Sequence, residues 1–427
     1  MPVPNRRQFL TATAALPVVH AFGCTGRTDH SATTTAEDKV EPEAKGPPFP
    51  IAESNNAFGC DLYGRLKLAQ GNVFFSPFSI EAALGMTSAG AKGNTLVEMQ
   101  KVLHLPAGEE NVHGGFKAMI ASLNNDKVPI DKRGYELTIA NALWGMTGFP
   151  WRKEFLATTN ANYGAGLIDT DFGQPEVARG IINKWVEQKT REKIKDLIPK
   201  GLLTPDTRMV LTNAIYFKGS WATEFDKKQT KVGPFHLADG TEQDAPLMYR
   251  HADMSYAETA DYQVIELPYK GQETAMLVWL PRKADGFADL ETKLSAKSIA
   301  DTVKALTPGT DVELTLPKFK VETEYSMGEP LTALGMKDAF DENKADLSGM
   351  HSGGGKLFIS AVVHKAFVDV NEEGTEAAAA TAVVIMWTSA RVPAEPKVFR
   401  ADRPFLFAIR HLPTGAVLFL GRVSRMK

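Results

Sequence analysis

Apolar residues recur at helical spacing early in the chain and in short β-branched runs later on. Val177, Ile181, Ile182, Trp185 and Val186, for example, lie three or four positions apart, which indicates one face of an amphipathic helix. The pattern predicts helices near 52–70, 77–90, 94–103 and 176–196. Apolar runs predict strands at 137–144, 209–217, 262–267, 274–280, 312–316, 357–370 and 416–423. Because helices and strands do not alternate regularly, this order predicts an α+β fold.

Composition supports a large folded domain without a global charge field. The chain has 427 residues, 43% hydrophobic and 23% charged, and no linker divides it after residue 50. Its net charge of −3 gives no indication of nucleic-acid binding. The most basic local run, 184–200, also contains Glu187, Glu192 and Asp196, so we interpret it as a solvated face of an amphipathic helix.

The N-terminus resembles a twin-arginine export signal over residues 1–24. Arg6 and Arg7 precede a modestly apolar run, 11–22, that is too short to span a bilayer as a helix. The signal predicts a periplasmic or extracellular protein. Cys24 ends a sequence similar to a lipoprotein cleavage site, although Ala21 stands where Leu is usual. Lipidation of Cys24, which would be the chain's membrane anchor, and ordinary cleavage near Ala21 or Gly23 both remain open. Residues 25–50 lack hydrophobic periodicity and predict a disordered tether before a domain at 51–427.

The sequence carries no pattern of catalytic or metal-binding residues. Its two cysteines, Cys24 and Cys60, cannot form a disulfide framework, and the helix-like surroundings of Cys60 predict a buried, unreactive thiol. G-x-S-x-G and H-E-x-x-H motifs are missing, and the glycines at 353–355 do not have phosphate-loop spacing. The nine histidines show no paired metal-ligand spacing. We therefore predict a protein that is not an enzyme and uses no metal or cofactor.

One segment combines a small-residue stretch with a β-branched one. It runs from Glu372-Glu373-Gly374-Thr375-Glu376 through four alanines to Thr388-Ser389. If it pairs as a strand, Glu376 lies on one face, because side chains alternate. The opposite face carries Thr375, Ala377, Ala379, Thr381, Val383 and Ile385. That face can be buried without burying a charge. From this segment alone, an exposed loop that becomes a strand, an Ala-rich surface helix and a fixed strand all remain open.

Five further stretches resemble, in order, the serpin family. They are Asn72-Val73-Phe74-Phe75-Ser76-Pro77-Phe78-Ser79-Ile80, Leu211-Thr212-Asn213-Ala214-Ile215-Tyr216-Phe217-Lys218-Gly219-Ser220-Trp221, Leu316-Pro317-Lys318-Phe319, Ala361-Val362-Val363-His364-Lys365-Ala366 and Arg403-Pro404-Phe405-Leu406-Phe407. The resemblance covers nearly all of 51–426. It implies an α+β fold with three β-sheets, eight or nine helices and an exposed reactive-centre loop that inserts into the main sheet.

The resemblance also assigns roles to residues. It implies a hinge at Glu372, Glu373, Gly374, Thr375, Glu376, Ala377, Ala378, Ala379 and Ala380. It implies a hydrogen-bonded shutter beneath the main sheet at Ser76, Ser79, Asn213 and His364, and a breach at its top at Lys318, Glu372 and Trp221. Counting fourteen residues from the hinge glycine places the reactive bond between Thr388 and Ser389. Because the following segment is about two residues longer than is typical of the family, neighbouring bonds remain open, with Trp387, Ala390 and Arg391 as the alternatives.

The function implied is suicide inhibition of a serine protease, in which the cleaved loop inserts before the acyl-enzyme is hydrolysed. Thr388 favours elastase-like or subtilisin-like targets, Met386 or Trp387 chymotrypsin-like ones, and Arg391 trypsin-like ones. A non-inhibitory serpin acting as a carrier or chaperone is the alternative. A cell-surface structural module is a third interpretation, which draws only on the tether and the anchor.

Overall fold

The computed structural model describes residues 47–107, 111–124, 128, 133–164, 166–353, 355–375 and 395–426. All of them belong to one unit, 40–427. The predicted export signal, nearly all of the predicted tether and residues 376–394, which include the predicted reactive bond, lie outside the described residues. The predictions for these segments therefore stay predictions.

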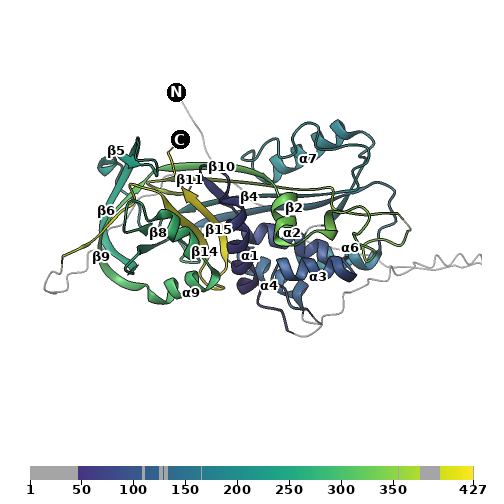
Figure 1. The fold of residues 1–427 in the computed structure, drawn as a ribbon, viewed down its shortest axis with the longest axis horizontal. Coiled ribbons are helices and arrows are strands. Elements are labelled where there is room, and N and C mark those ends of the chain that lie inside the picture. The colour runs from purple at the N-terminus through teal and green to yellow at the C-terminus, as the bar shows by residue number, and fades with distance from the viewer. Residues whose placement is uncertain are drawn as a thin grey trace, which may run out of the picture. The chain divides into compact units, whose positions relative to one another are not determined.

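The described residues form nine α-helices, in agreement with the predicted α+β fold (Figure 1). Each of the four helices predicted from periodicity is present. The helices are α1 (Ile51–Leu66), α2 (Pro77–Ser88), α3 (Gly93–Val102), α4 (Val112–Asn124), α6 (Lys153–Tyr163), α7 (Pro175–Lys189), α8 (Phe287–Lys293), α9 (Ala296–Ala305) and α10 (Gly328–Leu334). Two short 3₁₀ turns are η1 (Lys227–Gln229) and η2 (Asp338–Phe340).

The prediction of one helix through 176–196 is wrong in its last third. α7 ends at Lys189, and Arg191, Glu192 and Asp196 adopt positive φ angles of 51°, 61° and 50°, which a right-handed helix excludes. Thr190 closes the helix end, since its hydroxyl donates to the Val186 carbonyl at 2.8 Å and accepts the Ile194 N–H at 3.1 Å. Only the first part of the basic run at 184–200 is therefore a helix face.

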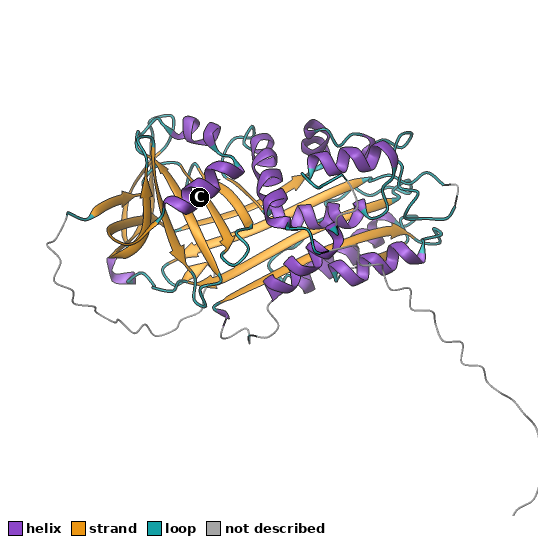
Figure 2. Cartoon of the chain, turned by 90° about the horizontal axis from the view of Figure 1, so that it is seen from below, coloured by secondary structure: helices purple, strands orange, loops and turns teal. Residues whose placement is uncertain are grey.

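The strands form one six-stranded and one nine-stranded sheet, with helices packed against them (Figure 2). The six-stranded sheet has the order β10-β11-β12-β4-β2-β3. Its strands are β2 (Tyr135–Met146), β3 (Leu167–Thr170), β4 (Met209–Ser220), β10 (Phe319–Ser326), β11 (Ala361–Asn371) and β12 (Gly374–Thr375). The strand predicted at 357–370 begins only at Ala361, because the backbone N–H groups of Ile359 and Ser360 bond to Ala339 and Met209 instead.

The nine-stranded sheet contains the other two expected sheets, joined through the long strand β6. Its strands are β1 (Val73–Phe75), β5 (Lys231–His236), β6 (Glu242–Glu258), β7 (Tyr262–Pro268), β8 (Thr274–Pro281), β9 (Thr307–Pro317), β13 (Lys397–Arg400), β14 (Phe405–His411) and β15 (Val417–Val423). The first part of β6 pairs with β5 and β9, and its last four residues pair with β7. Hydrogen bonding thus continues from one group of strands to the other.

Helix α2 lies in the interior and contacts strands of both sheets. All of its residues are buried, and it packs against β15, β2 and β4. Ser76 is its N-cap and accepts the Ser79 N–H at 3.1 Å, while Pro77 at the first helical position has no N–H to leave unpaired. This start holds both serines under the six-stranded sheet.

Strands β11 and β4 change their relation along their length. At one end they are direct parallel neighbours, with Ala361–Phe367 opposite Val210–Tyr216. At the other end β12 lies between them, antiparallel to both. The two central strands of this sheet are therefore parted at one end by the first residues of the predicted hinge.

Candidate functional site

The hinge enters the sheet at a glycine. Gly374 pairs with Asn371 on one side and Ser220 on the other, with a φ of 150°. A Cβ at this position would lie 2.0 Å from the Gly219 carbonyl oxygen. Both the backbone conformation and the space between the strands therefore require glycine here.

Thr375, the next residue, is fully buried. It lies opposite Val370 and Gly219, and its hydroxyl is 2.7 Å from that of Tyr269. Burial raises the pKa of Tyr269 well above its usual range, so the phenol keeps its proton. The first member of the predicted apolar face thus points into the core.

Tyr269 belongs to an aromatic cluster at this end of the sheet. Its ring stacks on that of Trp221 at 4.6 Å between centroids, and Phe225 packs edge-on to the same indole at 6.5 Å. Trp221 is 1% exposed, and its indole N–H donates to the Asn371 carbonyl at 2.9 Å. The cluster supports the backbone immediately before the hinge.

Glu372 is a nearly buried carboxylate held by an ion pair with a partly exposed lysine. Its carboxylate lies 2.9 Å from the Lys318 Nζ and accepts the Thr230 hydroxyl at 2.8 Å. The Glu372 side chain is 7% exposed and that of Lys318 is 38% exposed. Burial alone raises the pKa of Glu372, but the hydrogen bonds, above all that from Lys318, outweigh it and leave the pKa below its usual value. The carboxylate is therefore ionised at neutral pH.

Removing the two partners of this pair should have unequal effects. Lys318→Met leaves a buried carboxylate without its cation and should cost about 3–5 kcal/mol. Glu372→Gln keeps the Thr230 contact and leaves only a solvated ammonium, so we expect about 1–3 kcal/mol. Denaturant midpoints of both variants measure the difference. Equal losses, or a smaller loss in Lys318→Met, would contradict the assignment.

A second polar cluster lies below, where β4 and β11 are still direct neighbours. His364 Nδ1 donates to the side-chain amide oxygen of Asn213, and Asn213 Nδ2 donates to Ser79 Oγ at 2.7 Å. His364 Nε2 accepts the Ser76 N–H at 3.2 Å. Asn141 completes the cluster, because its side-chain amide oxygen accepts the Ser79 hydroxyl at 3.0 Å and Asn213 Nδ2 at 2.6 Å. These bonds fix one tautomer of a neutral imidazole.

Three members of the cluster occupy one row across the sheet. Asn141 of β2 lies opposite Asn213 of β4, which lies opposite His364 of β11. The His364–Asn213 bond therefore crosses the boundary between β4 and β11. Separating those strands must break this bond. The bonds of Asn213 to Ser79 and Asn141 can stay intact, because they do not cross the boundary between β4 and β11.

This cluster should make stability fall in acid. Burial lowers the pKa of His364 to about 3, whereas an unfolded histidine has a pKa of about 6.5. Below pH 6.5 the unfolded chain binds a proton at this histidine and the folded chain does not. The contribution of His364 to the free energy of unfolding is therefore complete above pH 6.5 and decreases as the pH drops toward 3. We expect this residue to lower the free energy of unfolding by about 2 kcal/mol at pH 5 relative to pH 7.5.

Unfolding midpoints of wild type and His364→Gln between pH 7.5 and 4.5 measure this contribution. The variant should be less stable at pH 7.5 but lose less stability on acidification. Burial also lowers the pKa values of His113 and His411 to about 4 and raises that of Glu81. These groups contribute slopes of opposite sign, and they do so equally in both proteins. Identical slopes would contradict the role of His364.

Sequence reasoning did not find three residues of this region. Asn141 is a lone polar residue within an apolar strand, which is the one signal the sequence offers. Tyr269 and Thr230 lie in connecting segments far from the hinge in sequence, and no spacing rule links them to it.

Cys60 is a half-buried free thiol whose pKa is raised to about 12 by burial, so it is protonated and unreactive.

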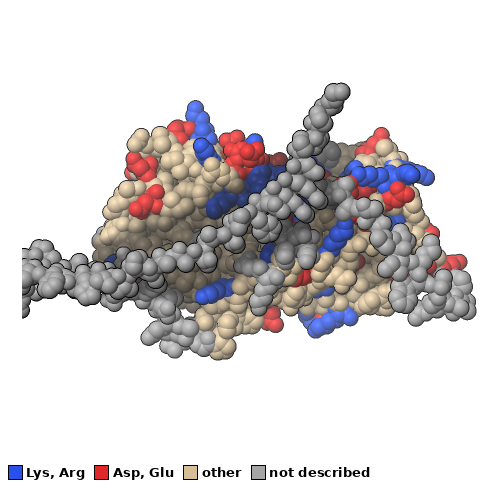
Figure 3. All heavy atoms as spheres, turned by 180° about the vertical axis from the view of Figure 1, so that it is seen from behind, with Lys and Arg blue, Asp and Glu red and all other residues tan. Residues whose placement is uncertain are grey.

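Charges of both signs alternate over the face shown in Figure 3. In the described part of the chain, no group of three or more His, Cys, Asp or Glu side chains has a metal-binding arrangement. None of the described helices is long and apolar enough to cross a bilayer.

The comparisons with known proteins decide the family. The model of the family described as Serpin (serine protease inhibitor) matches residues 53–426. The chain is a serpin. A serpin-like protein of Thermococcus kodakarensis is 39% identical over 437 residues, covering 99% of each chain. The human leukocyte elastase inhibitor is 40% identical over 388 residues, covering 88% of this serpin and 99% of the relative.

Solved serpin structures share the fold. Serpin48 of the insect Tenebrio molitor superposes with a TM-score of 0.78 at 34% identity, over 88% of this chain and 98% of the other. Human thyroxine-binding globulin superposes with a TM-score of 0.79 at 31% identity, over 88% and 99%. Both the α+β fold and the family expected from the sequence are confirmed. Serpins act on serine proteases as inhibitors in general, and the relatives include both an elastase inhibitor and a thyroxine-binding protein.

Proposed function

We propose that this serpin is a suicide inhibitor of a serine protease, and that its loop inserts between β4 and β11 after cleavage. The observation that carries the proposal is the pairing of Gly374 and Thr375 with both strands. If the pairing continues in the same register, Thr381, six positions beyond Thr375, lies opposite Asn213 and His364. Its hydroxyl then meets the groups whose mutual bond the insertion has broken.

The length of the loop makes insertion depend on cleavage. Fourteen residues, 375–388, span about 45 Å as a strand. The segment from Thr388 to Lys397 reaches at most about 30 Å when fully extended. It cannot return from the far end of the sheet while β13 stays paired with β9, so an intact loop cannot insert completely. Cutting the chain removes this constraint, and the uncut fold is therefore a kinetically trapped state.

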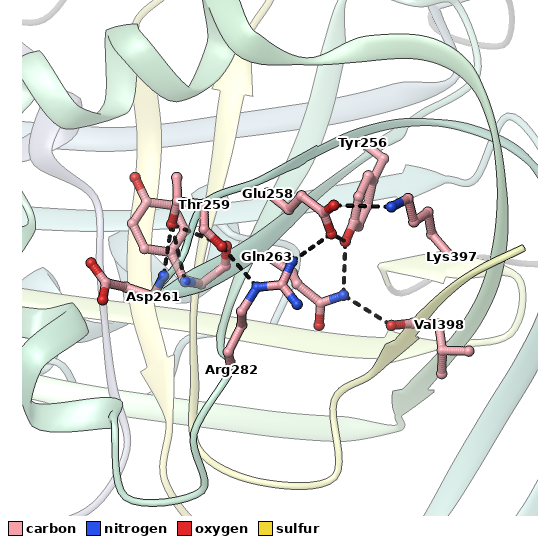
Figure 4. A network of polar contacts seen from close by, with 9 residues as sticks. Tyr256, Glu258, Thr259, Asp261, Gln263, Arg282, Lys397 and Val398 are labelled. Carbon is pink, nitrogen blue, oxygen red and sulfur yellow. Dashed lines mark hydrogen bonds and ion pairs between the residues drawn. The ribbon is translucent and has the colours of Figure 1, made fainter.

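A polar network holds the start of β13 in place (Figure 4). Glu258 forms ion pairs with Lys397 at 2.9 Å and with Arg282 at 2.6 Å. Gln263 Nε2 donates to the Val398 carbonyl at 2.9 Å. Hydrogen bonds from Tyr256 and Lys397 lower the pKa of Glu258 to about 2. The anchor on the far side of the loop therefore stays charged and fixed at neutral pH.

The expected chemistry begins when the protease serine attacks the bait carbonyl and forms an acyl-enzyme with the loop. Insertion then carries the attached protease by about the length of the inserted strand and distorts its oxyanion hole, which stalls hydrolysis. With Thr388 at the reactive bond, we propose elastase-like or subtilisin-like targets. We also propose an exported protein, periplasmic or extracellular, on the evidence of Arg6 and Arg7.

The test is to mix the mature protein with elastase-, subtilisin-, chymotrypsin- and trypsin-like proteases and analyse the products on denaturing gels. A complex that survives denaturation is expected with at least one of them. Mass spectrometry of the released C-terminal peptide then identifies the reactive bond. Complete loop cleavage without a complex by every protease would contradict inhibition.

The alternative function is that of a non-inhibitory carrier. The structural similarity to thyroxine-binding globulin supports this alternative. A loop that never inserts into the sheet has no buried face, and nothing then requires small residues at alternate positions. The buried Thr375 and the alanines at 377 and 379 therefore favour the inhibitor.

A further inference from the structure

A groove with a basic rim lies on the nine-stranded sheet, next to the hinge residues of the six-stranded sheet. It has a volume of about 480 Å³ and is bordered by η1, β5, β6, β9 and β13. Tyr249, Thr315 and Arg400 form one row across three of these strands. Strands β5, β6 and β9 lie together in Figure 1. The lining residues are Lys228, Gln229, Lys231, Val232, Gly233, Leu247, Tyr249, Thr315 and Arg400.

The charges of the groove are all positive. No Asp or Glu is among its lining residues. Arg400 is neutralised by Asp402, whose carboxylate lies 2.6 Å from its Nε. Lys228 and Lys231 are both exposed and have no ion-pair partner among the described residues. Two cations therefore face solvent without a direct ion pair beside the lining residues Leu247 and Tyr249. The nearby Asp226 carboxylate accepts the Lys228 N–H at 2.9 Å.

The groove lies between the two ends of the reactive loop. Lys227, next to the groove residue Lys228, forms an ion pair with Glu373 in the hinge. On the other side, Arg400 ends β13, the first strand after the loop. The groove therefore adjoins both segments between which the loop runs.

We infer that this groove is a second docking site for the target protease and receives an acidic surface segment of that enzyme. The inference rests on the proposed inhibitory function. Opposite charges on the two proteins steer the encounter and increase its rate, and salt weakens this effect. The apolar side chain of Leu247 and the hydroxyl groups of Tyr249 and Thr315 then offer contact area and hydrogen bonds. The loop sequence and the groove together select the protease.

The test compares two charge-reversed variants of the full mature chain. The first is Lys228→Glu with Lys231→Glu. Its matched control is Lys117→Glu with Lys304→Glu, which makes the same change in net charge at exposed lysines of α4 and α9. Rate constants for formation of the denaturation-resistant complex are measured at low and physiological salt, with the protease that the panel identifies. Thermal midpoints check folding, and Lys228→Ala with Lys231→Ala provides a milder change.

We expect the groove variant to form the complex about tenfold more slowly at low salt, with a weaker salt dependence. The alanine variant should fall between it and wild type, and the control should stay within about twofold of wild type. The yield of complex per cleaved inhibitor should not change, because insertion is untouched.

Equal rates in the groove variant and wild type, or equal slowing in the control, would overturn the inference while leaving the inhibitory function intact. Binding of dextran sulfate that depends on both lysines, without a change in the protease rate, would instead assign the groove to a polyanion and also overturn it. A wild-type protein that traps no protease at all would remove the inhibitory function, and the docking site with it.

Discussion

Thr375→Arg should convert the protein from an inhibitor into a substrate. Thr375 is fully buried between β11 and β4, and an arginine there would place an unpaired charge in the core at a cost of several kcal/mol. The hinge would then fail to enter the sheet, and deacylation would overtake insertion. We expect the yield of denaturation-resistant complex to fall about 100-fold or more while loop cleavage continues at a normal rate.

Glu376→Arg is the matched control for this change. It introduces the same side chain one position later, on the face that the alternation predicts to point outward. It should retain at least half of the complex yield. Equal loss in both variants would contradict the assignment of the two faces, and normal trapping by Thr375→Arg would contradict insertion itself.

Cleavage of the loop should make the protein much more stable. Insertion gives about a dozen further residues hydrogen bonds to the two neighbouring strands, while it breaks the direct bonds between β4 and β11 along Ala361–Phe367. At about 1 kcal/mol for each hydrogen bond gained net, the gain is on the order of 12 kcal/mol. For a domain of about 380 residues about 1.3 °C correspond to 1 kcal/mol, so the thermal midpoint should rise by roughly 15 °C. Differential scanning calorimetry of intact and cleaved protein measures this shift.

Cleaved Thr375→Arg is the control for the thermal measurement. Because its hinge cannot enter the sheet, cutting its loop should leave the midpoint within a few degrees of the intact variant. A large rise in that variant would mean that the gain comes from relaxation of the cut loop and not from insertion.

The predictions from sequence succeeded where one periodicity extends over many residues. The apolar runs at 209–217 and 274–280 became central strands of the two sheets, and the helix expected at 77–90 is α2. The face that begins with Thr375 was also predicted, because the alternation of strand side chains depends on local sequence alone. Of that face only Thr375 is among the described residues, and it is buried between β11 and β4. The other positions of the face stay a prediction.

Contacts between segments far apart in sequence were harder to predict. Thr375 meets Tyr269, which lies in the connection after β7, and no spacing within the chain reveals that approach. The strands β5, β6, β10 and β13 were missed because they carry many charged and polar residues on exposed faces. The basic groove arises only when these strands lie side by side, since Lys228 and Arg400 are far apart in the sequence.

Amide hydrogen exchange of the loop-cleaved protein tests the insertion most directly. The account predicts that backbone amides from 376 to about 386 become strongly protected after cleavage, together with those of β4 and β11 on either side, and that none of this protection develops in cleaved Thr375→Arg. Rapid exchange throughout 376–386 in the cleaved wild-type protein would contradict the account.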